Sequence, residues 1–310
     1  MGIGLLKSIP AVAVFCLVSA PCPAAAAAAA APVKAVGVET QYADVIAQIG
    51  GRYVTVSAII SDPNTDPHEF ELNPKIAARL AGAQLVVENG LGYDDWAGRM
   101  LDAAPDAQRR VINVQRLLGL PDNTPNPHLW YDPLTMPRVA DALAAILATM
   151  QPQHADDFRA NAARFDASLG PWRAALAAIK SADPGVPVAV TEPVGDALLT
   201  AAGAEILTPF TLQAAIMNGT DPAPQDVAAQ DLLLSGHKVR ALVYNEQVTD
   251  PLTASFLALA RANHIPVVGV YETMPAPGYD YQSWMLAETM ALRAAVEHGQ
   301  STPPLGKAPG

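Results

Sequence analysis

Short apolar strand patterns alternate with helical patterns in two separate sets, and this alternation limits the possible folds more than any other feature of the chain. In the first set, strand and helical patterns follow one another at residues 35–38, 42–49, 54–60, 75–81, 84–88, 94–103 and 110–114. The second set repeats the alternation at residues 187–191, 195–202, 224–235, 241–244, 250–263, 266–270 and 281–297. Strand–helix–strand units of this length predict α/β layers with mainly parallel sheets.

The two sets are separated by a long stretch, residues 133–182, in which apolar positions keep a helical period. Asp132 is a favoured N-cap residue and Pro133 suits the first helical position, so the start of this helix is well marked. A segment this long is no ordinary connection, and Pro152 predicts a kink within it. We therefore expect two α/β lobes with mainly parallel sheets, linked by one long rigid helix.

Composition divides the 310 residues into five parts. They are a signal peptide (1–31), an N-terminal α/β lobe (32–132), the linking helix (133–182), a C-terminal α/β lobe (183–300) and a flexible tail (301–310). The first part carries a single charge, Lys7, and its apolar run is too short to span a bilayer. Its last residues are small and offer cleavage sites, so we expect a cleaved leader and a periplasmic product.

Both cysteines of the chain, Cys16 and Cys22, lie within this leader. A lipid anchor is the alternative to simple cleavage, but it needs a small residue before the acceptor cysteine. Cys16 follows Phe15 and Cys22 follows Pro21, which favours cleavage without an anchor. The mature chain then has no cysteine, which excludes a disulfide framework and a thiolate metal site.

The charge balance excludes nucleic acid as a partner. Lys and Arg number 19 against 30 Asp and Glu, a formal charge of −11, which becomes −12 when the leader takes Lys7 away. Proteins that bind polyanions need clustered cations instead. The sequence also lacks GxGxxG, P-loop and GxSxG motifs, so the common cofactor and nucleophile sites are not indicated.

Two of the six histidines, His68 and His128, lie in unusual surroundings. Each follows a proline, which favours a rigid extended loop, and each precedes a helix at the end of a predicted sheet. This edge is the usual ligand position in open α/β folds. Loop histidines with only local hydrogen bonds are the alternative for both.

Two carboxylates occupy matching positions in the second half of the chain. Glu192 directly follows the strand pattern at 187–191, and Asp280 lies in the loop before the last helix. Either carboxylate could simply cap a helix. Together with His68 and His128, however, they could close around one divalent cation such as zinc, manganese or iron(II). No local spacing signature supports this set, so it is a hypothesis at this point.

Two segments carry a resemblance to a known family: Asp-Pro-His-Glu-Phe-Glu at 66–71 and Pro-His-Leu-Trp-Tyr-Asp-Pro at 127–133. With the leader and the long linking helix, they resemble the metal-binding solute receptors of ABC-type zinc and manganese importers. The similarity covers about residues 35–300. It implies a monomeric, non-enzymatic receptor that holds one divalent metal ion, Mn²⁺ or Zn²⁺, between two lobes and delivers it to an ABC permease in the inner membrane.

The resemblance also implies a ligand set. Carried over by position, His68 and His128 are the ligands from the first lobe, and Glu192 and Asp280 are those from the second. A glutamate at the third position is more similar to the manganese receptors than to the three-histidine zinc receptors. Glu246, which follows another strand pattern, is a candidate outer partner of the site or a replacement for Asp280.

Two other functions are alternatives. An exported metal-dependent hydrolase could use the same ligands, with an open coordination position and Glu69 or Glu246 as general base. A receptor for an organic solute would need an aromatic or arginine-lined cleft, and only 6% of the residues are aromatic. Trp130 and Trp284 either wall the site or belong to the core.

Overall fold

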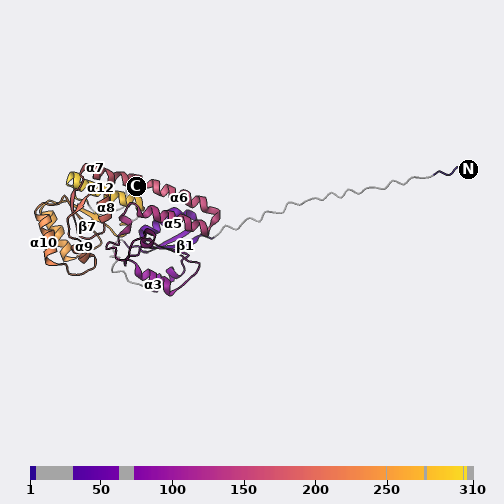
Figure 1. Ribbon diagram of the computed structural model, residues 1–310, viewed down its shortest axis with the longest axis horizontal. Coiled ribbons are helices and arrows are strands. Elements are labelled where there is room, and N and C mark those ends of the chain that lie inside the picture. The colour runs from indigo at the N-terminus through magenta and orange to yellow at the C-terminus, as the bar shows by residue number, and fades with distance from the viewer. Residues whose placement is uncertain (5–30, 63–72, 249, 276–277, 303, 306–310) are drawn as a thin grey trace. The chain divides into compact units, whose positions relative to one another are not determined.

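The computed structural model describes residues 1–4, 31–62, 73–248, 250–275, 278–302 and 304–305 (Figure 1). Residues 5–30 of the predicted leader, with Cys16 and Cys22, and the predicted ligand His68 lie outside the described residues. Residues 32–310 form one compact unit. Within the described residues, no helix has both the length and the apolar character needed to cross a bilayer.

Two four-stranded parallel sheets confirm the predicted α/β class. The first sheet has the order β2-β1-β3-β4 and consists of β1 (Val33–Glu39), β2 (Val54–Ile60), β3 (Leu85–Glu88) and β4 (Arg110–Asn113). The second has the order β6-β5-β7-β8 and consists of β5 (Pro187–Val190), β6 (Glu205–Ile206), β7 (Ala241–Asn245) and β8 (Val267–Val270). The strand order is therefore the same in both lobes. Strand β6 was not predicted, because two residues are too short to give a sequence pattern.

Helices cover both sheets. In the first lobe they are α1 (Thr40–Gly50), α2 (Pro74–Ala81), α3 (Asp95–Ala103) and α4 (Val114–Leu118). In the second lobe they are α8 (Asp196–Ala201), α9 (Phe210–Met217), α10 (Pro224–Ser235), α11 (Pro251–Ala262) and α12 (Tyr281–His298). Short 3₁₀ turns occur at Gly51–Tyr53, Leu129–Tyr131 and Pro152–His154. Of the helices, α4 and α9 were not predicted.

The segment between the sheets differs from the predicted single helix. It forms α5 (Thr135–Met150), α6 (Ala155–Ser168) and α7 (Gly170–Ala182). The chain turns at Pro152, which has no amide hydrogen to continue a helix, and α6 packs back against α5. Figure 1 shows α6 and α7 following each other in line, and they are separated only at Leu169. The link is thus a helical hairpin extended by α7.

One apolar core runs through both sheets and the link. It includes Val87 of β3, Leu143 of α5, Val188 of β5 and Trp284 of α12, all buried. Hydrogen bonds also join the lobes: the Tyr281 hydroxyl donates to the carbonyl oxygen of Trp130 at 2.6 Å. Because these contacts are buried, they hold the two sheets in a fixed arrangement.

The described part of the predicted flexible tail is hydrogen-bonded along β8. The backbone N–H of Thr302 donates to the Val267 carbonyl at 3.1 Å, and the Val267 N–H donates to Ser301 Oγ at 3.0 Å. The Leu305 N–H donates to the Tyr271 hydroxyl at 2.7 Å. As an edge strand, β8 offers unpaired backbone groups, and the tail occupies some of them.

Candidate metal centre

Polar side chains from both lobes meet where the carboxyl ends of the two sheets come together. His128 comes from the loop before Leu129–Tyr131, Asn245 ends β7, and Glu192 and Glu272 each follow a strand of the second sheet by two residues. All four are at most 3% exposed. The carboxyl ends of parallel strands are the general position of ligand sites in open α/β sheets.

The His128 ring is held in place by its own loop. Oδ1 of Asn126 accepts the His128 backbone N–H at 2.9 Å and lies 2.8 Å from Nδ1 of the ring. The other ring nitrogen, Nε2, faces the second lobe and lies 3.4 Å from Oε2 of Glu272. A proton or a metal ion between an imidazole nitrogen and a carboxylate oxygen so placed would interact favourably with both.

Glu272 is fixed from both lobes. The hydroxyl of Tyr93, from the first lobe, donates to Oε2 at 2.8 Å, and Nδ2 of Asn245 donates to Oε1 at 2.8 Å. Its backbone N–H donates to Oε1 of Gln247, and its carbonyl accepts from Nε2 of Gln41 in α1. The Tyr93 and Asn245 donors thus fix the orientation of the Glu272 carboxylate.

Glu192 belongs to the same network through one shared donor. Nδ2 of Asn245 lies 3.4 Å from both carboxylate oxygens of Glu192 and 2.8 Å from Oε1 of Glu272. The Asn245 backbone N–H in turn donates to the hydroxyl of Thr191. Two buried carboxylates on one amide concentrate negative charge, which burial penalises unless a cation offsets it.

Aromatic rings shield the centre. Trp130 meets the His128 ring edge-on with 5.4 Å between centroids, and Tyr93 does so at 5.8 Å. Trp130 is fully buried. Trp284 does not play this part: its Nε1–H donates to Glu288 and its ring packs on Tyr131 in the core. Excluding water from the centre strengthens every electrostatic interaction in it.

The predicted ligand set is thus partly brought together. His128 and Glu192 lie in one network, whereas Asp280 is the exposed N-cap of α12. Its Oδ1 accepts from the backbone N–H of Ser283 at 2.8 Å and from the Ser283 hydroxyl. This is the helix-capping alternative that the sequence left open.

Glu272 is a member of this network that was not predicted from the sequence. A usable signal was present, because Glu272 follows the end of β8 by two residues just as Glu192 follows the end of β5. Across the described part of the chain, no three His, Asp or Glu side chains converge closely enough to hold one ion by themselves. The network is therefore not a complete ion site by itself. His68, a further predicted ligand, lies outside the described residues.

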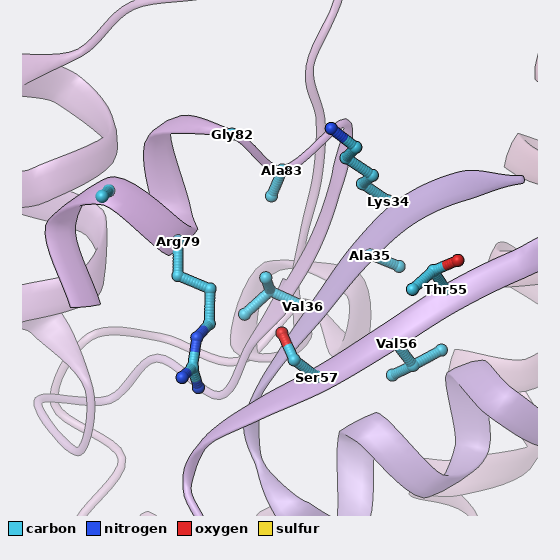
Figure 2. Close-up of a pocket in the computed structure, with 10 residues that line it drawn as sticks. Lys34, Ala35, Val36, Thr55, Val56, Ser57, Arg79, Gly82 and Ala83 are labelled. Atoms are coloured by element: carbon cyan, nitrogen blue, oxygen red, sulfur yellow. The ribbon is translucent and has the colours of Figure 1, made fainter. Parts of the chain in front are cut away.

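Two other cavities do not suit a divalent cation. Glu246 lines a cavity of about 240 Å³ with Tyr244 and Arg261, and its side chain lies over Gly269. Figure 2 shows a second cavity, about 310 Å³, beside the first halves of β1 and β2, into which Arg79 reaches from α2. Its lining contains Lys34 and Arg79 but no carboxylate or imidazole.

Comparisons with known proteins agree with the fold. A family profile described as ZnuA, zinc-uptake complex component A, periplasmic, matches residues 38–295. The manganese-binding lipoprotein MntA of Bacillus subtilis (strain 168) is 27% identical over 139 residues, which cover 42% of this chain and 44% of MntA. The chain thus spans less than half the length of this curated relative.

Solved structures match over most of the chain. A crystal structure of ZnuA superposes with a TM-score of 0.69 and 22% identity, covering 86% of this chain and 99% of that one. The periplasmic zinc-binding protein TroA from Treponema pallidum superposes with a TM-score of 0.71 and 15% identity, covering 87% and 100%. At these identities, the two likenesses establish the fold.

Proposed function

The chain belongs to the ZnuA family of zinc-uptake complex components, and on this premise we propose that it captures a divalent cation between its two lobes and delivers it to an ABC permease. One observation carries the proposal. Nε2 of His128 faces Oε2 of Glu272 at 3.4 Å across the lobes, inside a buried network that also contains Glu192. This arrangement supports a cation site whose walls come from two sheets.

The proposed ligands are His128, Glu192 and Glu272, with His68 from the segment after β2 completing the set. In this proposal, Glu272 replaces Asp280 as the fourth ligand. Its support is position and burial: Glu272 is fully buried beside His128, whereas Asp280 is exposed and caps a helix.

The donor chemistry favours Mn²⁺ or Zn²⁺ as the transported ion. Neutral imidazole and carboxylate suit both, and zinc has the higher intrinsic affinity for almost any such site. Two carboxylates that can each bind through both oxygens allow more than four bonds to the metal, which suits manganese. The names of the similar proteins point both ways, since MntA is named for manganese and TroA for zinc.

The mechanism we propose is binding and release without catalysis. Nε2 of His128 has to lose any proton before it can bind a metal, so capture of the ion releases protons. A hydrolase would need a general base beside the metal. Glu246 lines a separate cavity instead, and Glu69 lies outside the described residues.

We place the receptor in the periplasm as a monomer. The leader and the family description support export, while MntA is named a lipoprotein. Intact mass of the protein recovered from its native membrane and periplasmic fractions distinguishes a cleaved leader from a lipid-modified cysteine.

The decisive experiment measures metal content and affinity. Protein purified from the periplasm is analysed for its elements, then stripped and titrated with Zn²⁺ and Mn²⁺ at pH 7.5 and pH 5. We expect one ion per chain and weaker binding at pH 5, because protons compete for imidazole. Equal affinity at both pH values would contradict histidine ligation, and failure to bind either ion would refute the proposed function.

A further inference from the structure

Asn126 contacts both lobes at the edge of the metal centre, although it is not placed to bind the ion itself. Its Oδ1 accepts the backbone N–H of His128 at 2.9 Å and lies 2.8 Å from Nδ1 of the same residue. Its Nδ2 donates to the carbonyl oxygen of Pro193 at 2.7 Å. Pro193 directly follows Glu192. The half-buried Asn126 amide thus contacts one proposed ligand, His128, and the chain neighbour of another, Glu192.

The partners of Asn126 fix the orientation of its amide. A backbone N–H can only donate, so the atom facing the His128 amide has to be the oxygen. A backbone carbonyl can only accept, so the atom facing Pro193 has to be the NH₂ group. The two contacts agree, and the assignment of oxygen and nitrogen does not depend on a choice of flip.

This orientation decides which nitrogen of a neutral His128 ring carries the hydrogen. Because Oδ1 of Asn126 cannot donate, the Nδ1 atom 2.8 Å away has to carry a hydrogen. In a neutral ring the hydrogen is then absent from Nε2, whose lone pair faces the centre. Hydrogen bonds of this kind orient metal-binding histidines and set their tautomer.

The contact with Pro193 adds a second effect. The Pro193 carbonyl also accepts the backbone N–H of Asp196, at 3.4 Å, where the chain enters α8. Asn126 therefore ties the His128 loop to the loop that carries Glu192. Loss of this bond frees one loop relative to the other without removing either ligand.

We propose that Asn126 is a positioning residue that keeps the Nε2 lone pair of His128 directed at the metal centre and holds the Glu192 loop in register with it. The inference rests on the proposed function for its consequence, which is tighter metal binding. Its structural part, the tautomer and the loop register, is measurable without any metal.

The test compares Asn126→Ala and Asn126→Asp with a matched control. Asn161 donates from Nδ2 to the Ile49 carbonyl at 2.7 Å, the same length as the Asn126–Pro193 bond, but in the helical hairpin away from the centre. Asn161→Ala thus removes a similar bond elsewhere. The three variants and the wild type are labelled with ¹⁵N at histidine, stripped of metal, and studied at a pH where the His128 ring is neutral.

Long-range ¹H–¹⁵N spectra report the tautomer, with the His128 signal assigned by its loss in His128→Ala. We expect the Nδ1-protonated form in the wild type, in Asn126→Asp and in Asn161→Ala, and a mixture of tautomers in Asn126→Ala. Asp keeps the accepting oxygen but cannot donate to Pro193, so Asn126→Asp should speed hydrogen exchange of the Asp196 amide while leaving the tautomer unchanged.

Zn²⁺ titrations of the same proteins give the functional arm. Asn126→Ala should bind about 10- to 100-fold more weakly, Asn126→Asp should recover most of that loss, and Asn161→Ala should bind like the wild type. An unchanged tautomer in Asn126→Ala would overturn the positioning role, whatever the affinity. If the wild type itself bound no metal while the tautomer shifted as expected, the proposed function would fail and the positioning of His128 would stand.

Discussion

The two lobes have the same strand order but use the carboxylates at their strand ends in opposite ways. In the first lobe, Glu39 ends β1 and is fully buried near the Asp94 carboxylate. In the second lobe, Glu192 and Glu272 both accept hydrogen bonds from the Asn245 side-chain amide. Glu272 also accepts one from the Tyr93 hydroxyl. The same topology thus buries one carboxyl group near another carboxylate and gives two others a shared amide donor.

The pKa directions in the first lobe agree with this contrast. Burial, together with the nearby Asp94 carboxylate, raises the pKa of Glu39 well above its ordinary value. Burial also raises the pKa of Asp94 to about 7, although the backbone N–H groups of Gly90 and Asn89 lower it. Asp94 keeps a raised pKa despite these two donors, because the effect of burial outweighs them.

Neutralising Glu272 should have the largest effect on the metal centre. We expect Glu272→Gln to weaken Zn²⁺ binding by at least about 100-fold, because a ligand is lost and a neutral amide replaces it. Asp280→Asn is the matched control and should change the affinity less than about twofold, since Asp280 is exposed and caps α12. Isothermal titration of both variants checks this, and the opposite ranking would return the fourth ligand to Asp280.

A second test makes the second lobe resemble the first by removing its shared donor. Asn245→Leu keeps the approximate shape of the side chain but takes the amide from both carboxylates. We expect Zn²⁺ affinity to fall by about 10-fold or more, because the amide that orients both carboxylates is lost. Isothermal titration checks this, and an unchanged affinity would mean that Asn245 does not hold the carboxylates in place for the metal.

The third test concerns protons in the first lobe. The pKa of Glu39 is raised in the folded state, so the folded chain keeps a proton that the unfolded chain releases above about pH 4.5. Folding stability therefore falls as pH rises through this window, by at most about 1.4 kcal/mol per pH unit for each such group. Asp94 adds to the fall up to about pH 7.

Glu39→Gln removes one of these titrations. Urea unfolding of metal-free protein at pH 5, 7 and 8.5 should show that the variant gains stability relative to the wild type as pH rises. Glu288 is a second buried carboxyl group with a raised pKa. Burial raises the pKa of Glu288 to about 8, although hydrogen bonds from Tyr131 and Trp284 lower it. A stability difference independent of pH in Glu39→Gln would show that Glu39 is ionised in the folded protein.

How far the sequence could predict this molecule depended on the range of the interaction. The α/β class and most elements followed from local periodicity; the bounds of β2 and α10, for example, are those expected. The link over 133–182 did not, because apolar spacing is the same in one helix as in two helices that fold back on each other. Only the packing of α6 on α5 distinguishes them.

The candidate site could also be predicted only as far as local sequence patterns reached. His128 and Glu192 stood out through local motifs, and both lie in the network. The segment before α12 contains two acidic residues, Glu272 and Asp280, and the sequence does not show that only Glu272 lies in the network. A carboxylate that follows a buried strand by a fixed two residues, as Glu192 and Glu272 do, is the signal that would have distinguished them.

The smallest expected effect concerns the outer edge of the second sheet. Deletion of residues 301–310 removes the hydrogen bonds of Ser301, Thr302 and Leu305 to β8 and Tyr271. At about 1 kcal/mol for each bond, we expect the free energy of unfolding to fall by about 1–3 kcal/mol. Glu272, one residue after Tyr271, should keep its place because its own donors lie in Tyr93 and Asn245. Zn²⁺ affinity should then change less than about threefold; a loss comparable to that of Glu272→Gln would mean that the tail, rather than the donors, holds this carboxylate at the centre.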